Sequence, residues 1–190
     1  MELLKKMGWQ PASLPISADD VVEFHAARLL LLLKYCGVSG RIDGLTKMAK
    51  LDFFVRYPDF FDAAVAATPQ EDKPESFVAE GTNQSIESAM VRHHYGPWDK
   101  RYYHTLAYLE AKGLISVTKD NRTFKLILTD LGQESVGLLS KRQSFLPIIE
   151  RMRKVKKAYG NRTGSSLKKM IYDLFESEVR NRPMGEVIQK

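Results

Sequence analysis

The sequence predicts a mainly α-helical protein with a small antiparallel sheet, and residues 98–128 carry most of this prediction. Apolar side chains recur at helical spacing across 98–112, Pro97 suits a first helical turn, and Gly113 supplies a C-terminal stop. Two runs of alternating apolar residues follow in 115–128, joined by turn residues. A helix that leads into a hairpin is the second half of a winged helix-turn-helix core.

The helices before this segment follow from local caps and stops. A capping-box-like start at 17–20 opens a first helix, which ends at Gly37. A second helix covers about 45–56 and ends before Pro58, because proline disfavours helical backbone in the residue that precedes it. Residues 59–67 are expected to form a short third helix.

The remaining elements complete the expected core. Residues 68–83 contain two prolines and several acids, which is typical of an exposed loop. Residues 88–95 alternate and are expected to be the first strand of a three-stranded sheet that the hairpin completes. A helix that starts at 129–130 closes the unit. We therefore expect an N-terminal arm at 1–17 and a winged-helix domain at 18–140.

The net charge of +6 is distributed unevenly over the 190 residues. Residues 1–140 hold 16 basic and 18 acidic side chains, whereas 141–190 hold 13 basic and 5 acidic ones. The second segment is expected to be a basic C-terminal helical extension, with one helix opened by Pro147 and another from Ser165. Such a segment attracts phosphates or an acidic protein surface, although a solvated helix face explains many charge runs equally well.

Composition limits where the protein acts. Cys36 is the only cysteine, which leaves no intramolecular disulfide and no cysteine-based metal cluster. The longest apolar run, Leu29 to Leu33, is too short to cross a bilayer, and the N-terminus does not resemble a secretory signal. We expect a cytoplasmic protein without a membrane segment.

Catalytic signatures are not found in the sequence. His93 and His94 are adjacent on the expected strand, so their rings point to opposite faces and cannot easily share one metal ion. The glycines at 37–40 lack the Lys-Ser/Thr ending of a phosphate-binding loop, and no nucleophile elbow is present. We expect no enzymatic activity, no metal and no cofactor.

Basic side chains make nucleic-acid contact one hypothesis. In winged-helix proteins that bind DNA, the helix before the hairpin enters the major groove while cations of the wing meet phosphates. Acidic residues lie among these cations, and the helix carries small alanines, so a structural or protein-binding helix is favoured over one that reads DNA bases. The clustered charge on the C-terminal extension suits non-specific contact with DNA. The candidate DNA-binding residues are Lys100, Arg101, His104, Lys119, Arg122, Lys125, Arg151, Arg153, Lys154 and Lys157.

An apolar stripe on the extension suggests a protein partner. Its members are Phe145, Ile149, Met152 and Tyr159. A helix that carries cations on one side and such a stripe on the other either docks on its own domain or offers a surface to another chain. Of these two interpretations, the partner surface is the one we favour.

Several stretches together resemble a known family: GLTKMAKLDFFVRYP, ESAMVRHHYGPWDKRYY, FKLILTDLG, MIYDLF and RPMGEVI. They are similar to the small middle component of bacterial three-component ABC systems, the group that includes Lamassu-type antiphage defence. The resemblance covers about residues 25–188. It implies a non-enzymatic winged-helix adaptor that accompanies an SMC-like ATPase and an effector, often a nuclease.

The function expected from this resemblance is that of an accessory subunit. It would bridge or clasp the SMC-like ATPase and the effector in an antiphage complex, and it would touch DNA only non-specifically. The alternative is a winged-helix transcription regulator that binds an operator as a dimer.

Overall fold

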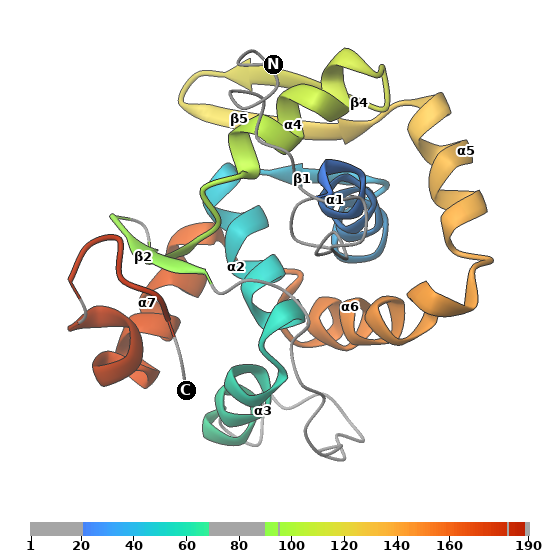
Figure 1. Ribbon diagram of the computed structural model, residues 1–190. Coiled ribbons are helices and arrows are strands. Elements are labelled where there is room, and N and C mark those ends of the chain that lie inside the picture. The colour runs from blue at the N-terminus through green and yellow to red at the C-terminus, as the bar shows by residue number, and fades with distance from the viewer. Residues whose placement is uncertain (1–20, 69–89, 95, 182, 189–190) are drawn as a thin grey trace, which may run out of the picture.

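The computed structural model shows helices packed around the central helix α1 (Val22–Cys36), with small antiparallel sheets beside them (Figure 1). It describes residues 21–68, 90–94, 96–181 and 183–188. The predicted fold class, mainly α with a small antiparallel sheet, is confirmed. The expected N-terminal arm, the helix start at 17–20 and nearly all of the expected loop at 68–83 lie outside the described residues.

Helix α1 (Val22–Cys36) lies at the centre of the fold. Four helices contact it: α2 (Leu45–Arg56), α4 (Tyr102–Ala111), α5 (Asp130–Leu139) and α6 (Leu146–Tyr159) (Figure 1). The run from Leu29 to Leu33 is buried throughout. A helical stretch that is apolar all round is stable only when it is covered on every side, and this arrangement covers the run from Leu29 to Leu33.

The main sheet contains the predicted hairpin. Its strands are β1 (Arg41–Asp43), β4 (Ile115–Asp120) and β5 (Thr123–Leu128), in the order β1-β5-β4. Asn121 adopts a positive φ of 53° in the turn between β4 and β5, a conformation that asparagine tolerates well. The hairpin predicted for 115–128 is therefore confirmed.

The first strand of this sheet is not the predicted one. The segment expected at 88–95 contributes β2 (Val91–His93), which pairs with β3 (Gly96–Trp98) in a separate two-stranded sheet. The edge of β5 is instead occupied by β1, whose buried Ile42 lies opposite Leu126. A three-residue strand such as β1 is too short to show alternation in the sequence. The longer alternating segment at 88–95 was therefore predicted to be the first strand.

The start of α4 also differs from the prediction. Pro97 lies in β3 and not in a first helical turn, and the helix begins at Tyr102 and not at residue 98. Asp99 accounts for the delay, because its carboxylate accepts a hydrogen bond from the backbone N–H of Arg101 at 2.9 Å. The predicted stop at Gly113 is confirmed by its positive φ of 68°.

The last fifty residues are not peripheral to the rest of the chain. Helix α6 packs on α1 and α2, and α7 (Gly164–Leu174) packs on α2 and on α3 (Pro58–Ala67). A π-helical segment, η5 (Glu176–Arg180), follows α7. The chain then runs beside β2, where Arg92 donates its backbone N–H to Glu186 and Ile188 donates to Met90, both at 2.8 Å. Side chains on both sides of residue 140 belong to one hydrophobic cluster.

Candidate interaction surface

The outer face of α4 is the surface that the fold presents beside the hairpin. Tyr102 and Leu109 point inward and are buried, whereas Tyr103 is 61% exposed and His104 is also exposed. Lys100 is exposed just before the helix. The structure therefore places two of the predicted DNA-binding residues, Lys100 and His104, on one open face beside a large aromatic ring.

The cations of the wing are partly engaged with neighbours. Lys125 donates to the carboxylate of Asp120 at 2.7 Å, and the ammonium of Lys119 lies 5.7 Å from the ring centroid of Phe124. Arg122 is exposed in the turn between the strands. Because Asp120 offsets one of three cations, the wing has less positive charge than the basic residues alone indicate.

Several cations of α6 hold the fold together. Arg151 donates to the backbone carbonyl of Val55 at 3.0 Å, and Lys156 donates to the carbonyls of Cys36 and Gly37 at the end of α1. Positive charge is favourable at a helix C-terminus, where the last carbonyls lack partners within the helix. Arg153 lies over the ring of Tyr35 at 5.2 Å.

The predicted DNA-binding residues do not form one surface. Lys154 and Lys157, together with Arg151 and Arg153, belong to α6, which lies on the opposite side of α1 from the hairpin (Figure 1). Part of the positive charge of the C-terminal segment is thus explained by contacts within the chain.

The apolar stripe of α6 is covered by the chain itself. Ile149, Met152 and Tyr159 are buried, and Phe145 is half-buried. The ring of Tyr159 lies 4.9 Å from that of Phe54, on α2. The partner-surface interpretation of this stripe is therefore corrected: α6 docks on its own domain, because α1 and α2 present a matching apolar surface.

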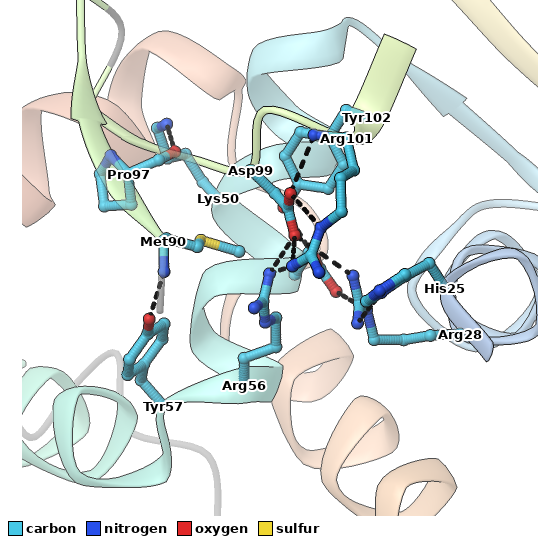
Figure 2. Close-up of polar contacts among 11 residues, drawn as sticks. His25, Arg28, Lys50, Arg56, Tyr57, Met90, Pro97, Asp99, Arg101 and Tyr102 are labelled. Atoms are coloured by element: carbon cyan, nitrogen blue, oxygen red, sulfur yellow. Dashed lines mark hydrogen bonds and ion pairs between the residues drawn. The ribbon is translucent and has the colours of Figure 1, made fainter. Parts of the chain in front are cut away.

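A buried polar network that the sequence analysis did not predict lies behind α4 (Figure 2). It comprises Arg28, Asp52, Arg56, Asp99, Arg101 and Tyr102. Asp52 accepts hydrogen bonds from Arg28 at 3.1 Å and from the hydroxyl of Tyr102 at 2.7 Å. One carboxylate of α2 thereby connects α2 to both α1 and α4.

Asp99 forms the second half of this network. It accepts from Arg56 at 2.8 Å and from two nitrogens of Arg101 at 2.9 Å. Burial alone raises the pKa of Asp99, but hydrogen bonds from Arg101 and the charges of Arg56 and Arg101 outweigh burial and hold the pKa well below its usual range. Arg101, predicted to contact DNA, is thus paired within the chain and anchors the start of α4.

A sequence signal for this network exists. Arg28 interrupts a run of alanine and leucine, and Asp52 interrupts the apolar residues of α2. A charged side chain in an otherwise apolar helix must find a partner, because an isolated buried charge is very costly. The sequence could therefore have flagged both residues, although not which charges pair.

A second buried charge, Lys50, lies on α2 close to β3 (Figure 2). Its ammonium donates to the carbonyl of Pro97 at 2.8 Å, and among the described residues it forms no ion pair with a carboxylate. Burial, together with the smaller effect of the charge of Lys168, lowers the pKa of Lys50 to about 7. Unlike the arginines of the network, this lysine has no opposite charge to compensate its burial.

Cys36 and His93 both make packing contacts within the fold. Burial raises the pKa of the Cys36 thiol to about 12, and the thiol donates to the carbonyl of Met152 at 3.3 Å. The ring of His93 stacks on Trp98 with centroids 5.5 Å apart. Within the described residues, no group of three or more His, Cys, Asp or Glu side chains is placed to hold a metal ion.

Comparisons of this chain with models of protein families, with curated proteins and with solved structures found no match. In the part of the chain that the structure describes, none of the helices combines the length and the apolar character needed to span a membrane.

Proposed function

We propose that this chain is a winged-helix accessory subunit without catalytic activity of its own, which joins other proteins in a cytoplasmic complex. The order of elements supports the winged-helix assignment: α1, β1, α2, α4, then the hairpin of β4 and β5, with β5 central in the sheet. In this assignment α3 and the β2-β3 sheet are an insertion between α2 and α4. Helix α4 occupies the position from which winged-helix proteins contact their targets.

The composition of the outer face of α4 carries the proposal. Tyr103 is the large exposed side chain of this face, and Ala107, Glu110 and Ala111 extend it. Tyrosine is typical of residues that dominate protein interfaces, whereas readers of base edges are mostly arginine, lysine, asparagine or glutamine. Arg101, which directly precedes α4, is held by Asp99. The face therefore suits a protein partner better than a DNA groove.

The family resemblance suggests which proteins these are. The proposed partners are an SMC-like ABC ATPase and an effector subunit of a Lamassu-type antiphage system, which the accessory subunit would bridge or clasp. Catalytic chemistry would then belong to the partner chains. The buried network of Asp52 and Asp99 supports such a role, because it fixes α4 to α1 and α2 and so presents a rigid face.

Replacing Tyr103 with glutamate should weaken the complex with the ATPase subunit by a factor on the order of 30, because an interface tyrosine commonly contributes about 2 kcal/mol. The measurement is co-purification with the products of the neighbouring genes, followed by titration of the isolated partners. Leu138→Glu is the matched control, since Leu138 is 67% exposed on α5. Loss of the complex in the Leu138 variant alone would place the interface elsewhere and contradict the assignment of α4.

A DNA-binding transcription regulator is the second candidate, and Lys100, His104 and Arg122 are the observation that favours it. All three are exposed: Lys100 just before α4, His104 on α4 and Arg122 at the tip of the wing. If the chain is a regulator, changing them to alanine should abolish a mobility shift on its own upstream region. If it is an accessory subunit, the same variant should assemble normally with its partners.

A further inference from the structure

A basic groove, separate from α4 and the wing, lies between α7 and the strand β2. Its lining comes from α2, β2, α7 and η5: Thr46, Arg92, Ser165, Lys168, Lys169, Tyr172, Asp173 and Arg180. The groove has a volume of about 610 Å³. Four of its side chains are basic and one is acidic, and none of the four basic ones is among the DNA-binding residues predicted from the sequence.

The sequence spacing of α7 builds one wall of this groove. Ser165, Lys168, Lys169 and Tyr172 recur at intervals of three and four residues, so they share one face of the helix. The buried Leu167 and Ile171 attach the other face to the core. The lysines are thus held along a line by a packed helix.

The opposite wall presents an arginine with an unused donor. The backbone of Arg92 is fixed on both sides, since its N–H donates to Glu186 and its carbonyl accepts from Gly185, each at 2.8 Å. The Nε of Arg92 is buried and has no hydrogen-bond partner in the part of the chain that the structure describes. A buried donor without an acceptor is costly, and the Arg92 side chain also lines the groove, where its guanidinium can meet an oxygen of a ligand.

Positive charge also accumulates behind the groove. Lys50 lies one turn after Thr46 on α2, and the charge of Lys168 acts on its ammonium. Among the groove cations, Arg180 forms an exposed ion pair with Glu176 at 3.4 Å, and the ammonium of Lys168 lies 5.4 Å from the ring centroid of Tyr172. An exposed pair of this kind contributes little, and a stronger anion readily displaces it.

We propose that this groove binds the phosphodiester backbone of a nucleic acid without regard to sequence. Arg92, Lys168, Lys169 and Arg180 would contact successive phosphates, and the hydroxyls of Thr46 and Ser165 would donate to phosphate oxygens. A groove that is lined by cations from four elements suits an extended polyanion. The inference goes beyond the accessory role above and does not depend on the identity of the protein partners.

The test uses the full chain and a fluorescent DNA duplex of random sequence, with affinity measured by anisotropy between about 50 and 300 mM salt. Changing both Lys169 and Arg180 to glutamine should lower the affinity at low salt by about tenfold or more, and should reduce the slope of log K against log salt by about 1.8, because two phosphate contacts are lost. Both side chains are exposed, so folding should be retained. A second variant, Arg92→Gln, tests the opposite wall.

The matched control changes Lys141 and Arg142 to glutamine, which removes the same charge from an exposed turn after α5. Its salt slope should equal that of the unchanged chain. An equal loss in the control, or no measurable binding at low salt, would overturn the proposal. Displacement of the duplex by inorganic phosphate or ATP at submillimolar concentration would indicate a small-anion site instead, and displacement by polyglutamate at equal charge would indicate an acidic protein ligand.

Discussion

Replacing Asp52 with asparagine should lower the free energy of unfolding by about 3–5 kcal/mol, one of the largest effects available in this protein. Asp52 is fully buried between Arg28 at 3.1 Å and the hydroxyl of Tyr102 at 2.7 Å. Asparagine keeps the volume but removes the negative charge. The buried guanidinium of Arg28 then loses its charged partner at 3.1 Å, whereas the carboxylate of Asp99 lies farther away, at 3.8 Å.

Urea denaturation at neutral pH measures this effect, and Asp43→Asn is the matched control. Asp43 pairs with Arg41 on the exposed edge of β1, at 3.1 Å, so its replacement should cost less than about 1 kcal/mol. Combining Asp52→Asn with Arg28→Met should cost less than the sum of the two single changes, because the uncompensated charge is removed as well. A loss below about 1 kcal/mol for Asp52→Asn alone would show that the network contributes little to stability.

The sequence predicted local elements well because their signals are local. Gly37 and Gly113 end their helices, Pro58 separates α2 from α3, and the turn at Asn121 joins the hairpin. Each of these positions acts through the backbone of its immediate neighbours. A helix stop or a tight turn can therefore be predicted without knowledge of the rest of the fold.

Pairings between distant segments were not predictable in the same way. The sequence contains both Ile42 and the alternating residues from 88 to 95, and nothing local determines which of these pairs with β5. The stripe of α6 is a similar case, since Ile149 and Met152 are equally suited to a partner or to the chain's own α1. Only the assembled fold decides, because both alternatives bury the same apolar surface.

The distribution of charge along the sequence did not predict where positive charge is exposed in the fold. Lys156 contributes to the basic balance of the last fifty residues, yet it binds carbonyls at the end of α1. Lys47 does the same for the end of α6, where it donates to Gly160 at 2.8 Å. Conversely, Arg92 lies in a segment without positive excess but lines the basic groove. The distribution of charge in space, and not along the sequence, determines where an anion is attracted.

Lys50→Met should raise the stability of the protein at pH 6 by on the order of 3 kcal/mol, the second large effect that we expect. Lys50 is fully buried, and burial lowers its pKa from 10.5 to about 7. Below pH 7 the folded chain must therefore carry a buried ammonium, which within the described residues has the carbonyl of Pro97 as its hydrogen-bond acceptor. Methionine has a similar shape, fills the same space and carries no charge. The hydrogen bond to Pro97 is lost, but this costs only about 1 kcal/mol.

The dependence on pH distinguishes this explanation from a simple improvement in packing. Between the folded pKa of about 7 and the unfolded value of 10.5, the unfolded chain binds a proton that the folded chain lacks, so stability should rise with pH across this window. The advantage of the methionine variant should accordingly shrink above pH 7, by up to about 1.4 kcal/mol for each pH unit. Denaturation of both proteins from about pH 6 to 9.5 gives the difference in their free energies of unfolding at each pH, in which the contributions of other titrating groups cancel. The control Lys141→Met, in an exposed turn, should give a difference that does not change with pH. A difference in stability that stays constant across this range would mean that the charge of Lys50 is not the cause. A methionine variant that is less stable than the unchanged protein at pH 6 would mean that the hydrogen bond of Lys50 outweighs the cost of burying its charge.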